Sequence, residues 1–597
     1  MGGGAGSSER CDLEGGLRGC LHGRVACGYP GVRVRLSYVQ PNEERRRPGR
    51  PGSSRGVRNA PETADIVIVG AGASSAAMAW RLSGKGLKIV VLERGDWVDQ
   101  HRSPSLRPDW ELALQSEYHA NPNIRRAPAD YPVNEVDTPI KPAIFNAVGG
   151  GTIRWGAHFP RQHPSDFRVR SLDGVAVDWP LTYDDLVPYY DLNDRMMGVS
   201  GLAGDPANPD RAVRPNPPLP MCPATRALAG GFDELGWHWW PSDAAILSVD
   251  DANGRSACNS CGPCGLGCPR YARASVDVTY WRSAITAGIE LRTGHVVRKL
   301  EMGKVGQVNL VRYINSNGHE GTISSQVVVV ACNGLGSARL LLASGDGDRD
   351  GDGIANASGL VGRNLMLHPT AIVTGVFKEQ LKSYRGPFAS ALYSQEFYES
   401  DRERGFVRGF QLQALRGQGP LSTALGGYMR RLPWGTGHHS RFVREFGRTV
   451  SLTVTCDDLP ESENRVTLEP GNRDRWDMAI PRMYYRLGEN TKRMIAFGID
   501  RAREALEAAG ARDVVVNPLA RQAGFHMLGT ARMGLDPKSS VVDADCRCHT
   551  VDNLMIIDGS VFPTASAVNP TPTIQAIALR AADRLLARLG MPQERAA

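Results

Sequence analysis

A histidine and an asparagine in the carboxyl-terminal part of the chain have the side chains best suited to proton chemistry. His526 stands in the segment FHMLGT, and Asn569 stands in the segment NPTPTI. A neutral imidazole has a pKa near ambient pH and can accept a hydroxyl proton, while an amide can hold the oxygen without competing for that proton. The pair predicts a site with His526 as base and Asn569 as anchor; a packed histidine and a helix-capping asparagine are the structural alternatives.

The elements predicted around this pair can bring His526 and Asn569 close together in the fold. Residues 554–557 have the pattern of a buried strand, which is followed by Asp558 and Gly559. From Pro570 onward, apolar residues at helical spacing predict a helix with one buried face. The positive amino-terminal end of this helix, at Pro570 and Thr571, can stabilise negative charge on a neighbouring group.

The amino-terminal part of the chain has the pattern of a dinucleotide-binding unit. A predicted strand, the segment GAGASS and a predicted helix follow one another over residues 65–82. Gly70 permits the tight turn, Gly72 lets a pyrophosphate approach the backbone, and Ser75 replaces the usual third glycine. A second predicted strand ends in Glu93, which can accept hydrogen bonds from an adenosine ribose. The alternative is a tight turn that binds no ligand.

A second glycine-rich segment, VGGGTIRWG, contains Gly149, Gly150, Gly151 and Trp155. Without side chains, such a backbone can lie against a flat ring system. Further along, residues 327–342 read as another buried strand, turn and helix. The chain therefore has several elements that could surround one large planar ligand.

Four cysteines lie close together in the segment CNSCGPCGLGCP. Cys258, Cys261, Cys264 and Cys268 have the spacing of bacterial ferredoxin loops, although no second such segment exists to complete a two-cluster arrangement. An iron–sulfur cluster, a zinc site, disulfides and reduced structural thiols all fit this pattern. Metal binding by these four residues is one of the hypotheses that the spacing supports.

An acidic segment resembles half of a calcium loop. DGDRDG at 346–351 matches the first positions of an EF-hand, but Ala357 stands at the twelfth position, where a bidentate Glu is required. The segment therefore favours a solvated turn over a calcium site.

Taken together, these motifs resemble the glucose–methanol–choline (GMC) oxidoreductase family, particularly its sugar-oxidising branch with pyranose oxidase and the flavoprotein of gluconate 2-dehydrogenase. The segments DWPLTY and PYY, at 178–183 and 188–190, strengthen the likeness, which covers about residues 62–588. The resemblance implies hydride transfer from an alcohol carbon to flavin N5, with His526 and Asn569 at the His–Asn pair of the family. Arg154 stands where pyranose oxidase has its flavin-linked histidine, so the resemblance implies noncovalent FAD.

The resemblance and the motifs together predict the cofactor contacts. Asp558 is expected to bind a flavin ribityl hydroxyl, or else simply to form a turn. The residues expected to contact FAD are Gly70, Gly72, Ser75, Glu93, Arg94, Gly149, Gly150, Gly151, Trp155, Val297, Asp558, Gly559, Pro570 and Thr571.

The expected activity is oxidation of a sugar, polyol or other alcohol. Two rival functions stay open: a flavin-dependent lyase of the same family, and a non-catalytic electron carrier that uses a flavin and an iron–sulfur cluster. Oxygen, a quinone, a cytochrome or another carrier could reoxidise the flavin.

We expect an α/β fold in which a Rossmann-like FAD domain carries an inserted antiparallel-sheet substrate domain. The alternating pattern of residues 370–510 supports that sheet. The predicted segments are a disordered basic tail (1–60), a first FAD segment (61–165), a substrate or cap segment (166–255), the cysteine-rich loop with a second FAD segment (256–369), the substrate domain (370–515) and a third FAD segment (516–597).

Composition and charge narrow the function classes. The chain has 597 residues and a net charge of +7, and residues 1–60 contribute 11 Arg against 5 Asp and Glu. The remainder is close to neutral, which argues against a nucleic-acid surface. The sequence shows neither an apolar stretch long enough to span a bilayer nor a signal-peptide pattern, so we expect no transmembrane segment and a cytoplasmic location.

Overall fold

The computed structural model describes residues 61–251, 253–304, 306–345, 353–388, 391–427 and 432–592. The chain separates into two units, 1–59 and 60–597, and all described residues belong to the second. The basic tail predicted for 1–60 and the acidic segment at 346–351 lie outside the described residues.

The first sheet has the strand order β5-β2-β1-β8-β7-β6, and a further strand, β16, pairs with the end of β8. β5, β2, β1, β8 and β16 pair in parallel, whereas β6, β7 and the start of β8 pair antiparallel. Continuous runs of valine and isoleucine form the parallel core, as expected for strands covered on both faces. The strands are β1 (Glu62–Val69), β2 (Ile89–Leu92), β5 (Glu290–Arg292), β6 (His295–Met302), β7 (Val308–Asn315), β8 (Glu320–Val330) and β16 (Leu554–Ile556).

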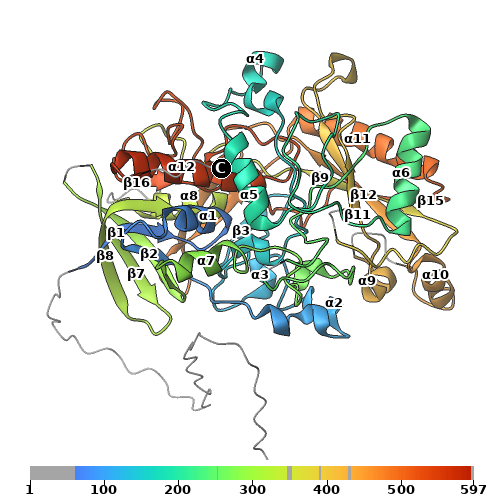
Figure 1. Cartoon of the computed structure of the whole chain (residues 1–597), viewed down its shortest axis with the longest axis horizontal. Coiled ribbons are helices and arrows are strands. Elements are labelled where there is room, and N and C mark those ends of the chain that lie inside the picture. Colours follow the sequence, from blue (N-terminus) through green and yellow to red (C-terminus); the bar gives the residue numbers. More distant parts are fainter. Residues whose placement is uncertain are drawn as a thin grey trace, which may run out of the picture. The chain divides into compact units, whose positions relative to one another are not determined.

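Helices from both ends of the chain cover this sheet (Figure 1). α1 packs against α12 and α7, and α12 also packs against α5. A buried ion pair joins α1 to α12: Arg81 Nε lies 2.6 Å from Asp583 Oδ1, so two segments far apart in sequence form one layer. The helices are α1 (Ala73–Leu82), α5 (Val187–Met197), α7 (Tyr280–Thr286), α8 (Asn333–Ala343) and α12 (Thr571–Arg588).

The second sheet is antiparallel, with the strand order β15-β9-β12-β11-β10-β4. The helices α6 (Pro223–Leu235) and α11 (Glu489–Ala508) lie beside it in Figure 1 and pack on one another, and α11 contacts β9 and β12. Gly498 of α11 permits this close approach, because a Cβ there would lie 2.3 Å from Val454 Cγ1. The strands are β4 (Trp240–Pro241), β9 (Thr370–Val376), β10 (Leu392–Ser394), β11 (Phe410–Leu415), β12 (Thr449–Cys456) and β15 (Asp513–Asn517).

A small third sheet, ordered β13-β14-β3, completes the pattern. The expected α/β fold, with a Rossmann-like sheet and an antiparallel second sheet, is confirmed, and the first sheet takes its strands from three separated stretches. No helix in the described ranges is long and apolar enough to cross a membrane. The remaining elements are β3 (Asn134–Asp137), β13 (Arg465–Arg473), β14 (Ala479–Tyr484), α2 (Trp110–Ala113), α3 (Pro122–Arg125), α4 (Val169–Asp173), α9 (Pro420–Leu425) and α10 (His438–Glu445).

Candidate active site

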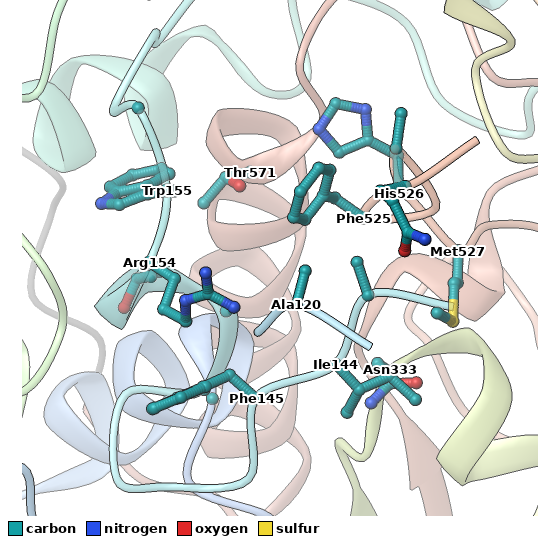
Figure 2. Close-up of a pocket in the computed structure, with 18 of the residues that line it drawn as sticks. Ala120, Ile144, Phe145, Arg154, Trp155, Asn333, Phe525, His526, Met527 and Thr571 are labelled. Atoms are coloured by element: carbon teal, nitrogen blue, oxygen red, sulfur yellow. The ribbon is translucent and has the colours of Figure 1, made fainter. Parts of the chain in front are cut away.

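One cavity of about 980 Å³ runs from the turn after β1 to a face of the second sheet. We call its two regions the glycine end, lined by Gly70, Gly72, Gly150 and Gly151, and the sheet end, lined by Thr370, Ile372, Gln413, Thr453 and Thr455. His526 and Asn569, which the sequence singles out, line the same cavity. Figure 2 shows His526 together with aromatic and polar side chains from several separated segments.

The glycine end is shaped by the main chain. Gly70 has φ +97°, and a Cβ there would lie 2.5 Å from the Ala331 carbonyl oxygen, so only glycine fits this turn. At Gly72 a Cβ would meet nothing within 4 Å, while one at Gly150 would lie 3.2 Å from Gly72 Cα. The two glycine turns thus approach each other beside open space.

The first turn of α1 can receive an anion at this end. The helix begins at Ala73 with Gly72 as its cap, and no side chain bonds its first amides. Unpaired amides at a positive helix terminus favour a phosphate group.

Glu93 lies beside this turn and holds it in place. Its Oε2 accepts the amide of Ala71 at 2.8 Å, and its Oε1 accepts the amide of Gly95 at 2.7 Å. Burial raises the pKa of this carboxyl group. A carboxylate oxygen can accept more than one hydrogen bond, so Glu93 can also bind a ligand hydroxyl. The adjacent Arg94 lines the cavity and packs over the ring of Tyr131.

Two of the residues expected to contact a cofactor do not line the cavity. The hydroxyl of Ser75 donates to the Gly72 carbonyl at 3.0 Å, and the amide of Gly149 donates to the Ala71 carbonyl at 2.8 Å. These two hydrogen bonds stabilise the glycine turns without contributing to the cavity lining. The residues from the same expectation that do line it are Gly70, Gly72, Glu93, Arg94, Gly150, Gly151, Trp155, Val297, Asp558, Gly559, Pro570 and Thr571.

Trp155 and Arg154 form a wall between the two ends. The indole Nε1 of Trp155 donates to the Ala274 carbonyl at 2.8 Å, which fixes the ring. Arg154 lies 5.8 Å from the centre of the Phe145 ring, and burial lowers its pKa to about 10. Both side chains reach the cavity in Figure 2.

The carboxyl-terminal elements supply another part of the cavity wall. Asp558 accepts the Ser560 amide at 2.9 Å and the hydroxyl of Ser337, and burial raises the pKa of its carboxyl group. The start of α12, at Pro570 and Thr571, faces the cavity without a capping side chain. The positive end of an 18-residue helix is therefore open to a bound group.

The proposed base and anchor are both available for chemistry. His526 is half-buried, and burial lowers its pKa well below the usual 6.5. Its imidazole is therefore neutral at pH 7 and can accept a proton. The Oδ1 atom of Asn569 is buried and has no hydrogen-bond partner in the described part of the chain. An unsatisfied buried oxygen of this kind is costly unless a ligand pairs with it.

Further histidines at the site escaped the sequence reasoning, among them His368 and His158. His368 Nδ1 lies 2.9 Å from His526 Nδ1, and His158 lines the cavity with an unpartnered Nδ1 among the described atoms. Burial lowers the pKa of each to about 4. Neither belongs to a motif with a fixed spacing, so no local pattern in the sequence could indicate them.

The cysteine segment does not form a recognisable metal site. Cys258, Cys261, Cys264 and Cys268 are free thiols, and the described ranges contain no group of three or more His, Cys, Asp or Glu placed to hold a metal. The Sγ atoms of Cys258 and Cys268 accept backbone amides at 3.4 and 3.5 Å. Burial raises the pKa of Cys258 to about 12, which disfavours the thiolate that a metal requires. The structure therefore gives the metal hypothesis no support.

Sequence profiles match three parts of the chain. Two profiles described as GMC oxidoreductase match residues 139–370 and 460–578, and one described as an NAD(P)-binding Rossmann-like domain matches residues 68–106. The first two matches contain His526, Asn569 and the second glycine-rich segment, and the third contains the first glycine turn.

Curated relatives match nearly the whole described unit. The 2-methyl-1,2-propanediol dehydrogenase of Mycolicibacterium austroafricanum is 38% identical over 536 residues, covering 88% of this chain and 95% of the relative. The 6'''-hydroxyparomomycin C oxidase of Streptomyces lividus is 31% identical, with 88% and 92% covered. The large subunit of fructose dehydrogenase from Gluconobacter japonicus is 28% identical, with 88% and 98% covered.

Solved structures share the fold. Pyridoxine 4-oxidase from Mesorbium loti superposes with a TM-score of 0.59 at 18% identity, covering 88% of this chain and 99% of that one. A variant of formate oxidase from Aspergillus oryzae RIB40, solved to study FAD modification, gives a TM-score of 0.60 at 16% identity, with 88% and 98% covered.

Proposed function

This chain belongs to the GMC oxidoreductase family, and from that premise and the cavity we propose that it binds FAD noncovalently and oxidises the CH–OH group of a neutral diol, polyol or sugar. One observation supports the proposal above all. His526 and Asn569 share a single cavity with two glycine turns at one end and a polar sheet face at the other. Such a cavity can hold a planar cofactor and a small polar substrate in contact.

The residues at the glycine end fit an FAD molecule. Open space at Gly72 and Gly151, where a Cβ would meet nothing, accommodates a ligand against the backbone. In this proposal the amides at the start of α1 bind the pyrophosphate and Glu93 binds the adenosine ribose. Trp155 would contact the ring system and Asp558 the ribityl chain. Noncovalent binding accords with Arg154 at the position where pyranose oxidase has its flavin-linked histidine.

FAD, when bound, supplies the hydride acceptor for oxidation of the alcohol carbon. His526, neutral at pH 7 because of burial, accepts the hydroxyl proton on a ring nitrogen as the carbonyl forms. Asn569 holds the same oxygen by donating a hydrogen bond from its side-chain Nδ2, and its Oδ1, which has no partner in the described part of the chain, is left to accept from another ligand group. The amino-terminal end of α12 stabilises negative charge at the adjoining wall.

The sheet end supports a neutral, hydroxyl-bearing substrate. The side chains of Gln413, Thr453 and Thr455 present uncharged hydroxyl and amide groups there, and Arg416 and Arg521 also line the cavity. Such hydroxyl and amide groups pair well with sugar and diol hydroxyls.

The carboxylates in the cavity wall already accept hydrogen bonds from backbone amides of the protein. Glu111 accepts the amides of Leu421 and Ser422 at 2.7 and 3.0 Å, while Glu93 and Asp558 accept the bonds described above. A cationic substrate would therefore find no uncommitted carboxylate among the described lining residues. The name of the most similar relative quoted above, a dehydrogenase of a small neutral diol, agrees with this assignment.

An anaerobic absorption spectrum of the purified protein tests the proposal. We expect flavin bands that bleach on addition of 2-methyl-1,2-propanediol or fructose, and bleach far more slowly with the cation paromamine. Flavin that none of these alcohols bleaches would favour the lyase alternative. A protein that neither contains nor binds FAD would overturn the proposal.

A further inference from the structure

His368 makes a contact with the proposed base that the alcohol chemistry described above does not include. Its Nδ1 lies 2.9 Å from Nδ1 of His526, and the two rings meet edge to face at 78° with their centroids 5.0 Å apart. His368 is 1% exposed, so water does not compete for this contact. Two imidazole nitrogens at this distance must share one hydrogen, because two lone pairs would repel each other.

The backbone brings the two histidines together. Met366 and Leu528 form an antiparallel bridge, with their amides donating to each other's carbonyls at 3.1 and 3.0 Å. His368 lies two residues after Met366 and His526 two residues before Leu528, so this bridge brings the two histidines close together. Gly529 permits the approach, since a Cβ there would lie 2.2 Å from the Asn364 carbonyl oxygen.

The loop that carries His368 is held in an unfavourable conformation. His368 has φ +50°, a left-handed backbone that costs a non-glycine residue free energy. The preceding residue is fixed by Asp458, whose Oδ2 accepts the Leu367 amide at 3.0 Å and the Tyr485 hydroxyl at 2.7 Å. Buried strain of this kind is typical of a side chain that must occupy one position.

The second nitrogen of His368 decides where the shared hydrogen lies. Nε2 of His368 is 3.2 Å from the carbonyl oxygen of Ala565, and a carbonyl can only accept. Nε2 must therefore carry the ring proton, which leaves Nδ1 of a neutral His368 as an acceptor. The hydrogen in the contact then belongs to Nδ1 of His526, and Nε2 of His526 has the free lone pair.

We propose that His368 is a positioning residue that fixes His526 in the Nδ1–H tautomer, so that Nε2 of His526 is the atom that accepts the substrate proton. When Nε2 takes that proton, the Nδ1–H of the resulting imidazolium still donates to His368, now as a charge-assisted hydrogen bond. The proton is conserved throughout: it leaves the hydroxyl group and stays on His526. His368 thus orients the base without carrying a negative charge. This inference rests on the proposed role of His526.

Nitrogen NMR of the FAD-bound protein labelled with ¹⁵N-histidine tests the tautomer directly. The signals of His526, identified by their loss in His526→Ala, are expected to show a protonated Nδ1 and an unprotonated Nε2. In His368→Ala the ring should shift toward the Nε2–H tautomer that free histidine prefers. A wild-type His526 with a protonated Nε2 would overturn the proposal whatever the variants do.

Kinetics with 2-methyl-1,2-propanediol separate positioning from folding. His368→Ala should lower the rate of flavin reduction by about 10- to 100-fold, with FAD content and KM nearly unchanged. His368→Asn should recover most of this loss, because its amide oxygen can accept from His526 and asparagine tolerates a left-handed backbone. His549→Asn is the matched control: its Nε2 bonds Ser540 away from the cavity, so the rate should stay at the wild-type value.

The outcomes distinguish this inference from the proposed function. If His526→Ala reduces flavin at the wild-type rate, the proposed function fails, while the tautomer measured by NMR still tests the role of His368. If His368→Asn holds FAD and melts at the wild-type temperature but loses as much rate as His368→Ala, an acceptor at this position is not sufficient and the inference fails.

Discussion

At the turn after β1 the cavity wall is main chain, whereas on the second sheet it consists of threonine and glutamine side chains. Gly70 and Gly72 shape the glycine end because they have no Cβ. A Cβ would clash at Gly70 and would enter the open space at Gly72. Thr453 and Gln413 shape the sheet end by presenting a hydroxyl and an amide group to the cavity. The comparison teaches that one end selects its ligand by shape and the other by hydrogen bonding. Each should respond to a different kind of substitution.

Substitution of the proposed base, His526, should give the largest effect. His526→Ala is expected to retain FAD but to lower the rate of flavin reduction by on the order of 10²–10⁴-fold, the usual contribution of a positioned base. Anaerobic stopped-flow with 2-methyl-1,2-propanediol measures the rate, and the ratio of flavin to protein absorbance measures cofactor content. Loss of FAD in this variant would make His526 a structural residue of the glycine end instead.

A methyl group added at the glycine end should weaken the cofactor alone. Gly72→Ala places a Cβ in open space, so the apoprotein should fold normally while FAD affinity falls by about tenfold or more. Fluorescence titration of the apoprotein with FAD measures the affinity. Gly230→Ala on α6 is the matched control, because its Cβ also meets nothing but lies outside the cavity. Equal FAD affinity in the two variants would show that no ligand approaches Gly72.

Loss of a hydroxyl at the sheet end should change substrate binding alone. Thr453→Val keeps the shape of the side chain, and we expect KM for a diol or sugar to rise by about fivefold to tenfold with FAD content unchanged. Steady-state kinetics measure the change. Thr449→Val, on the same strand but outside the cavity lining, provides the control. A fall in FAD content in Thr453→Val, with KM unaltered, would remove the distinction between the two ends.

The smallest effect concerns pH. His526 must be neutral to accept a proton, and burial holds its pKa well below 6.5. The base therefore stays active as the pH falls through 6.5, and kcat/KM should stay level there and decline only at lower pH. A pH profile of kcat/KM measures this. An acid limb centred at 6.5 or above would mean that the imidazole is not desolvated in the working enzyme.

The glycine end is built from local patterns in the sequence, whereas the sheet end is not. A turn such as Gly70–Gly72 is encoded within a few residues, because the strand, the positive φ and the helix start are all local. The polar face on β9, β11 and β12 arises only when distant strands pair, so alternation predicted a sheet but not which side chains meet a substrate. The contact between His368 and His526 spans 158 residues and depends on one backbone bridge. Ser75 and Gly149, which the sequence predicts to contact the cofactor, do not line the cavity, because both bond within the turns.

The ion pair between Arg81 and Asp583 has a consequence for synthesis of the protein. α12 forms one layer with α1, and its first turn supplies a wall of the cavity. Asp583 follows Arg81 by 502 residues along the chain, so the amino-terminal strand and glycine turn must wait for that stretch to be synthesised before their layer is complete. The cavity wall supplied by α12 can therefore form only after that helix has been synthesised.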